Sequence, residues 1–404
     1  MHTNPSSPTR RRGARRVSWR ARIAGLSLIA VLAGTAGSTA AGAGAVGGPI
    51  SIGETGCGTP AAHMPAGPIL FTVTSTDTRN AYASVYVINL SGGLVFAEIP
   101  SLAPAKVLPL STTLSAGTYA LRCVFTDGTV QTSPPFTLTG TAVGAVTGYP
   151  PMGDLELEQP VRAYTAYVEA ALPTLLADST TLNADIAAGN LTAAKTDWLT
   201  AHLDYERLGA AYNAFGEYDG EINGLATGLP QGTDTPGWTG FFAIEHALWS
   251  GRSAAAVQPL TKNLVSKVKA LIRDFPSEEV DPGDLPLRAH EILENSLQFQ
   301  LTGIADYGSG TTLATVYANT QGTTEILSIL KSLLAPRDQS LLPTIDQDLK
   351  RLQSDLLAQR ASNGTWTPLA DVAPAQRRRI DSDTGALLEE LAPIPNLLTP
   401  RNSA

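Results

Sequence analysis

The spacing of apolar residues changes near residue 150, and this change limits the folds that the chain can adopt. Between residues 50 and 140, apolar residues come in short runs rich in Val, Thr, Tyr and Phe, separated by Gly, Pro, Asn or Asp. From residue 154 onward they recur instead every three or four positions. The first pattern is typical of β-strands and the second of amphipathic helices. The sequence therefore predicts a multidomain β + α protein.

The β part is expected to form a small β-sandwich over residues 50–140. Its strand candidates are short and closely spaced, which favours two packed sheets. They cover residues 69–73, 81–90, 94–99, 106–114, 118–125 and 135–138. Residues 141–153 are rich in Gly, Pro and small residues, and we expect them to form a linker.

The second part is expected to form an all-α bundle over residues 154–395. Asp154 stands near the start of the first periodic segment, where it is a candidate N-cap. Further amphipathic segments follow, separated by breaks rich in Gly and Pro, and they predict a bundle of seven or eight helices. They cover residues 190–216, 239–250, 257–275, 285–303, 312–335, 340–361 and 374–392.

Residues 1–45 have the layout of a secretory signal peptide. Seven arginines and no acidic residue precede an apolar run from Ile23 to Ala36, and small residues follow it. The pair Arg15 and Arg16 also fits the twin-arginine export route. A transmembrane anchor is the alternative, although the run is short and rich in Gly and Ala for a bilayer span. We expect an exported protein of the periplasm, the cell envelope or the extracellular space.

The remaining chain is strongly acidic. Removing those seven arginines from the 28 Lys and Arg residues leaves 21 basic against 36 acidic side chains, a formal charge of −15. Such a surface repels phosphate backbones and attracts cations, so nucleic acid is excluded as an expected partner.

The chain has two cysteines, Cys57 and Cys123, and both lie in its first third. An isolated pair in an exported protein most simply forms one disulfide. Closing a loop of this length would stabilise the domain by roughly 4 kcal/mol in the chain-entropy description.

Histidines beside glutamates are the clearest candidates for a polar site, because standard catalytic signatures such as H-E-x-x-H and G-x-S-x-G are missing. Three such pairs lie on separate helical segments, two with i,i+4 spacing and one with adjacent residues. They are His202 with Glu206, His290 with Glu294, and His246 with Glu245. An i,i+4 pair shares one helix face and can offer a nitrogen and an oxygen to one ion. The alternative is that each is an ordinary surface pair.

Five strings carry a family resemblance: Ile99–Pro104 and Ala116–Cys123 in the β part, and Ala188–Leu191, Tyr205–Arg207 and Gly237–Glu245 in the helical part. In this order along the chain they resemble the EfeO family of extracytoplasmic iron-uptake components, the first two its cupredoxin-like domain and the other three its imelysin-type domain. The resemblance implies a cupredoxin-like β-sandwich followed by an imelysin-type helical bundle. It also implies an exported protein that binds iron and delivers it to a membrane iron permease, with an exported peroxidase as a further partner.

One departure from the family concerns its G-x-H-x-x-E motif, whose His and Glu are metal ligands. The chain keeps Gly240 and Glu245 but has Phe242 in the histidine position, and Phe cannot bind a metal. Three glutamates of the expected polar cluster remain, and three histidines are candidates to complete it. The metal-ligand candidates are therefore Glu206, Glu245, Glu294, His202, His246 and His290.

Two functions follow from this departure. A site of carboxylates with one imidazole would suit Fe2+ or Fe3+, Mn2+ or Ca2+, which accept oxygen ligands. In the alternative, the chain has lost the metal site and serves as a binding or scaffold module of the envelope. We do not expect an enzyme, because a zinc peptidase needs about three fixed ligands and Phe242 removes one of them.

Overall fold

The fold is taken from a computed structural model that describes most of the chain. The expected signal peptide at residues 1–45 and the candidate cap Asp154 lie outside the described residues. Among the helices that the structure describes, none has the length and apolar character to cross a membrane. The described ranges are 46–79, 81–91, 93–153, 155–209, 215–277 and 280–399.

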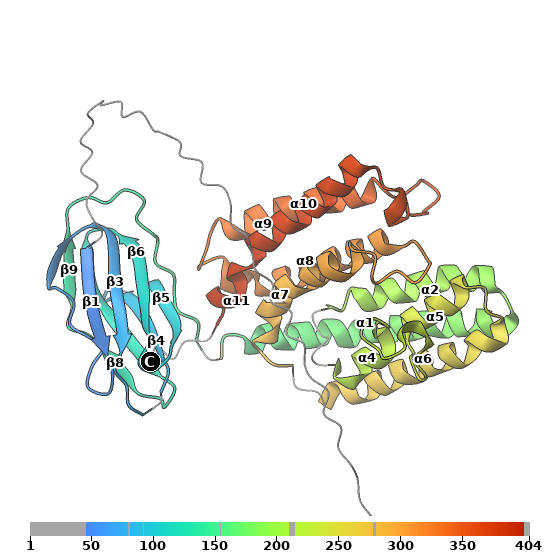
Figure 1. Cartoon of the computed structure of the whole chain (residues 1–404), viewed down its shortest axis with the longest axis horizontal. Coiled ribbons are helices and arrows are strands. Elements are labelled where there is room, and N and C mark those ends of the chain that lie inside the picture. Colours follow the sequence, from blue (N-terminus) through green and yellow to red (C-terminus); the bar gives the residue numbers. More distant parts are fainter. Residues whose placement is uncertain are drawn as a thin grey trace, which may run out of the picture. The chain divides into compact units, whose positions relative to one another are not determined.

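The β part consists of two sheets (Figure 1). The first has the order β1-β3-β6, with β1 parallel to β3 and β6 antiparallel to it. The second has the order β2-β9-β7-β4-β5, and β8 also pairs with β7. The strands are β1 (Val46–Ile52), β2 (His63–Pro65), β3 (Gly67–Ser75), β4 (Ala83–Asn89), β5 (Val95–Leu102), β6 (Val107–Leu114), β7 (Gly117–Phe125), β8 (Val130–Thr132) and β9 (Phe136–Thr139).

The two sheets share one apolar core, which confirms the predicted sandwich. Side chains of β3 alternate between buried and exposed, as expected for a strand with one face on a core. Phe71 of β3 and Phe136 of β9 meet edge to face across the sheets, with ring centroids 5.8 Å apart.

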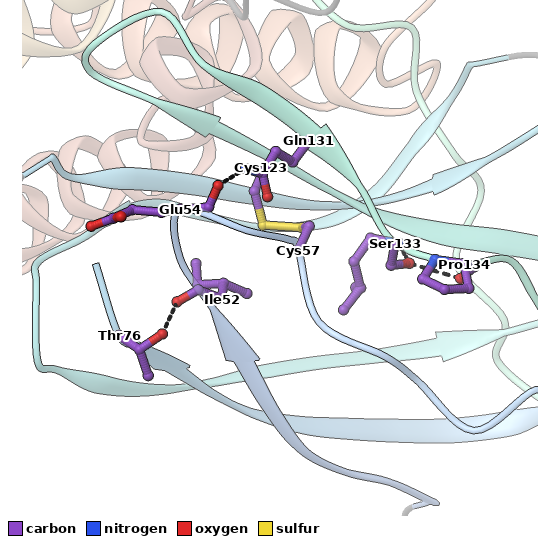
Figure 2. The surroundings of a disulfide bond; sticks show 9 residues. Ile52, Glu54, Cys57, Thr76, Cys123, Gln131, Ser133 and Pro134 are labelled. Atoms are coloured by element: carbon purple, nitrogen blue, oxygen red, sulfur yellow. Dashed lines mark hydrogen bonds between the residues drawn. A yellow bond between two sulfur atoms is a disulfide. The ribbon is translucent and has the colours of Figure 1, made fainter. Parts of the chain in front are cut away.

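The predicted disulfide between Cys57 and Cys123 is confirmed, and both side chains are fully buried. Figure 2 shows that it ties the loop after β1 to strand β7. Close to it, the side-chain amide of Gln131 donates a hydrogen bond of 2.6 Å to the backbone oxygen of Glu54. The disulfide and this hydrogen bond therefore both fasten the loop after β1 to neighbouring strands of the second sheet.

The second part is all-helical, as predicted, and has a separate apolar core. The long helix α1 packs beside α2 and α6 (Figure 1), and Gly189, with a φ of 79°, forms the left-handed end of α1 before α2. The helices are α1 (Glu158–Ala188), α2 (Leu191–Glu206), α4 (Glu217–Asn223), α5 (Phe241–Trp249), α6 (Ala254–Asp274), α7 (Asp284–Asn295), α8 (Thr312–Leu334), α9 (Leu341–Leu357), α10 (Pro374–Leu391) and α11 (Pro393–Leu397).

Two expected helices differ from the structure. The helix expected over 190–216 ends at Glu206, close to Gly209, whose missing side chain leaves room for Ile292. The segment expected over 285–303 is α7 followed by a π-helical turn, η4 (Ser296–Gln300). Both changes occur beside the cavity described next.

Candidate functional site

A cavity of about 300 Å³ lies in the helical part and is called the Glu206 cavity below. Its wall combines carboxylates, side-chain amides and apolar side chains, and no Lys, Arg or His is among its described lining residues. The lining residues are Glu206, Asp219, Asn223, Gly224, Leu225, Thr227, Phe242, Ile292, Asn295, Phe299, Gln300 and Asn319.

Glu206 is the buried carboxylate of this cavity. It is the last residue of α2 and is 1% exposed. The side-chain amide of Asn223, at the end of α4, donates to its Oε1 at 2.8 Å. Burial acts to raise the pKa of Glu206, but His202, Asn223 and Asn319 outweigh it and hold the pKa below its usual value. The Glu206 side chain therefore carries a negative charge at neutral pH.

His202 is close to Glu206 but outside the lining of the cavity. Its Nε2 lies 3.0 Å from Oε1 of Glu206, although the ring is not oriented for a regular hydrogen bond. Its other ring nitrogen, Nδ1, is buried without a hydrogen-bond partner. The imidazole stacks on Trp198 and also contacts the rings of Phe241 and Phe242. The sequence pair His202 and Glu206 thus lies inside the bundle, held by aromatic packing.

Gly240 fixes how α5 enters this region. Its φ is 88°, and a Cβ there would lie 2.4 Å from the backbone oxygen of Ile222, next to Asn223. Only glycine fits such a backbone approach with this φ. The glycine of the motif therefore sets the start of α5 against the end of α4.

Phe242 fills the space that the motif histidine would take. It is 2% exposed and lines the Glu206 cavity. Its ring centroid lies 5.1 Å from that of His202 and 5.5 Å from that of Tyr307. An apolar ring thus stands in the histidine position of the motif, as the sequence shows.

Glu245, one helical turn after Phe242, holds the loop that precedes α8. Its Oε1 accepts the backbone N–H groups of Tyr307 at 3.1 Å and Ser309 at 2.9 Å. Its Oε2 is buried and has no hydrogen-bond partner. Burial raises the pKa of Glu245 to about 7, against these hydrogen bonds. The described contacts of Glu245 therefore fasten a loop and leave one oxygen unsatisfied.

The other three candidates lie apart from the Glu206 cavity. His290 and Glu294 form their own pair on α7, with 3.6 Å between Nδ1 and Oε2 and with 24% and 42% of the side chains exposed. Glu294 also accepts the side-chain amide of Gln298 at 2.9 Å. His246 packs against Trp238, with ring centroids 6.0 Å apart.

Within the described residues, no group of three or more His, Cys, Asp or Glu side chains lies close enough to hold a metal ion. Among the described residues, the structure pairs His202 with Glu206 inside the bundle and His290 with Glu294 nearer the surface, without joining the two pairs in one group. Glu245 lies one helical turn after Phe242, whose ring contacts that of His202. The arrangement therefore offers a cation one charged carboxylate in a polar cavity, not a complete set of protein ligands.

Sequence reasoning missed the amides that complete the cavity wall. Asn223 Oδ1 and Gln300 Oε1 are buried atoms without hydrogen-bond donors. Asn319 was assigned no role from the sequence; its side-chain amide donates to Ser296 Oγ at 3.0 Å. No spacing in the sequence links these residues to Glu206, because they come from α4, η4 and α8.

A family model designated as peptidase family M75, imelysin, matches residues 160–394, more than half of the chain. The chain belongs to the imelysin family. Among curated imelysin relatives, the iron uptake system component EfeO of Escherichia coli strain K12 is 26% identical over 313 residues, covering 76% of this chain and 81% of the relative. EfeO of Yersinia pestis is 23% identical over 349 residues, covering 86% of this chain and 90% of the relative. The match to both relatives extends beyond the imelysin segment into the β part, since it covers more of the chain than that segment does.

Proposed function

We propose that this imelysin protein is an exported, EfeO-like component of an iron uptake system that binds iron or another divalent cation. The carrying observation is the Glu206 carboxylate, kept charged and buried in a cavity whose described lining has no competing cationic side chain. Burial of a charged carboxylate costs free energy through desolvation, and a cation in the cavity would offset part of that cost.

The wider role follows from the relatives and the sequence. The relatives named above are iron uptake system components and share most of their length with this chain. The arginine-rich, apolar start of the sequence supports export to the periplasm, the envelope or the extracellular space. The protein would deliver the cation to a membrane iron permease, and an exported peroxidase is the second proposed partner.

Calorimetric titration with Mn2+, and with Fe2+ under anaerobic conditions, tests the proposal directly. Glu206→Gln keeps the size of the side chain and removes its charge, so binding should weaken at least tenfold. Glu294→Gln is the matched control, because Glu294 is a partly exposed glutamate of the same bundle outside the cavity lining. Absence of binding to the unaltered protein at micromolar concentration would refute the proposal.

The second candidate is a metal-free binding or scaffold module. Phe242 in the histidine position and the lack of a three-residue ligand group among the described residues favour it. Peptidase activity has weaker support, since a zinc hydrolase needs about three fixed protein ligands and an open position for water. Elemental analysis of protein purified from its native host separates the candidates: stoichiometric iron supports the first, and metal-free protein that takes up no added metal supports the second.

A further inference from the structure

We infer that two tryptophans, Trp249 and Trp198, carry single electrons from iron bound in the Glu206 cavity to a one-electron oxidant at the surface of the helical part. This inference rests on the proposed function and adds a redox step to it, the oxidation of Fe2+ to Fe3+. It follows from the order of side chains along α2, from the contacts between their rings and from the charges at the two ends of the path.

The inner part of the path lies on one face of α2. Trp198, His202 and Glu206 follow one another at intervals of four residues on this helix, so they share a face. The imidazole of His202 stacks on Trp198 with ring centroids 5.0 Å apart, and its Nε2 lies 3.0 Å from Oε1 of Glu206. A single imidazole therefore separates the Trp198 indole from the carboxylate in the cavity wall.

The outer part of the path is Trp249, the last residue of α5. Its ring meets that of Trp198 edge to face, with centroids 5.3 Å apart. Trp198 is 1% exposed, whereas Trp249 is half-buried and lies at the margin of the apolar core. Indole is among the side chains that lose one electron most readily, so this pair can conduct electrons between the interior and the surface.

Charges at the two ends give the path a direction. Nζ of Lys195 lies 4.8 Å from the centre of the Trp249 ring, where its positive charge disfavours the loss of an electron from that ring. At the inner end, Glu206 carries a buried negative charge next to His202 and favours a positive charge on Trp198. An electron vacancy formed on Trp249 is therefore more stable on Trp198, and it moves inward as the electron moves outward.

The redox step transfers one electron and no atom. The oxidant takes an electron from Trp249, Trp249 takes one from Trp198, and Trp198 takes one from Fe2+ in the cavity, which becomes Fe3+. The indole N–H of Trp198 donates to the backbone oxygen of Phe241 at 2.8 Å and keeps its proton in this hydrogen bond. Both rings are restored, so each cycle converts one Fe2+ and reduces one oxidant. The charged Glu206 side chain favours the product, because Fe3+ carries one more positive charge than Fe2+.

Flash oxidation tests the path first in the metal-free protein. Tris(bipyridine)ruthenium(III), generated by a light pulse with a cobalt(III) ammine as electron acceptor, is a one-electron oxidant too large to enter the cavity of about 300 Å³. We expect a long-lived indole radical in transient absorption, because Trp198 is buried. Trp249→Phe and Trp198→Phe should each lower its yield about tenfold. Trp366→Phe is the matched control, because Trp366 is a buried tryptophan with Arg360 over its ring and lies outside the path.

Loading the protein with Fe2+ under anaerobic conditions tests the transfer from iron. The indole radical should then decay faster than in the metal-free protein. Fe3+ should appear in electron paramagnetic resonance spectra about tenfold more slowly in Trp249→Phe than in the unaltered chain or in Trp366→Phe. Trp249 lies outside the lining of the cavity, so Trp249→Phe should bind Fe2+ as tightly as the unaltered chain, which calorimetry checks. Circular dichroism checks that each variant folds.

The outcomes separate the electron path from the proposed function. If Fe2+ binds but is oxidised at the same rate in Trp249→Phe, the path is wrong and the proposed function stands. If the unaltered chain binds no Fe2+, both are wrong. A radical yield that is unchanged in Trp249→Phe and Trp198→Phe would also overturn the path, as would an equal loss in Trp366→Phe.

Discussion

Removing the disulfide of the β-sandwich should selectively destabilise that part of the chain. The change is Cys57→Ala with Cys123→Ala, in a bond whose two side chains are fully buried. The β part and the helical part have separate apolar cores among the described residues. The effect should therefore stay within the sandwich.

The magnitude follows from the loop that the disulfide closes. The two cysteines are 66 positions apart. In the chain-entropy description, a closed loop of this length removes enough freedom from the unfolded chain to stabilise the fold by about 4 kcal/mol at 25 °C. In a domain of roughly 100 residues, each 1 kcal/mol shifts the melting temperature by roughly 4 to 8 °C. We therefore expect the sandwich to melt roughly 15 to 30 °C lower.

The positions of the tryptophans allow the two parts to be followed separately. Trp198, Trp238, Trp249 and Trp366 lie in the helical part, and the fifth tryptophan lies in the expected signal peptide. Tryptophan fluorescence during denaturation therefore reports on the helical part of the mature chain. Hydrogen exchange of the β7 amides, measured by mass spectrometry, reports on the sandwich.

Two results would refute this reasoning. One is a loss of less than about 1 kcal/mol in the sandwich, which would mean that the unfolded chain gains little freedom. The other is an equal shift of the tryptophan transition, which would mean that the two parts unfold together. Wild-type protein refolded in reductant is the control, because it keeps both cysteine side chains and lacks only the bond.

Three further predictions concern the helical part. Gly240→Ala should lower the free energy of unfolding of the helical part by about 2 kcal/mol or more, because a Cβ would lie 2.4 Å from the Ile222 carbonyl oxygen and the φ is 88°. Denaturation followed by tryptophan fluorescence measures this loss, and an unchanged midpoint would contradict the prediction. Burial and a neighbouring carboxyl raise the pKa of Asp197 to about 6, above its ordinary 3.8. Between about pH 4 and pH 6 the folded protein therefore binds more protons at Asp197 than the unfolded chain does, and the free energy of unfolding falls as the pH rises through this range. Asp197→Asn should flatten that slope in denaturation curves measured across this range, whereas an unchanged slope would assign it to other groups. Phe242→His restores the motif with Glu245 and should tighten Mn2+ binding at least tenfold by calorimetry; unchanged affinity would show that the imidazole cannot reach the ion.

The sequence was sufficient for the two-part architecture because the two periods differ strongly. It was insufficient for β1, a strand that begins Val-Gly-Gly-Pro and has little strand propensity of its own. That strand exists because it pairs in parallel with β3, from Ile69 to Ser75. Such pairing joins segments distant in sequence and leaves no local signal.

The candidate site shows the same division between local and distant information. The i,i+4 spacing placed His202 with Glu206 and His290 with Glu294 on shared faces, and the structure has both pairs within 3.6 Å. Spacing could not tell which face is buried: the first pair is 1% exposed at both residues, and the second lies largely near the surface. Burial depends on the packing of α4, α5 and α8 around α2, and the amide Gln300 reaches the cavity only through the π-helical turn.

That turn, Ser296–Gln300, has a consequence for how the wall of the Glu206 cavity can change in this family. A π-helical turn contains one more residue than the α-helical turn it replaces. Deleting one residue of the turn before Gln300 would rotate the side chains that follow by about 100° and turn Gln300 away from the cavity. The amino acids that line the cavity would all still be present in the sequence. The lining of such a cavity can therefore change by the gain or loss of a single position in the chain, a change that comparison of matched residues alone would overlook.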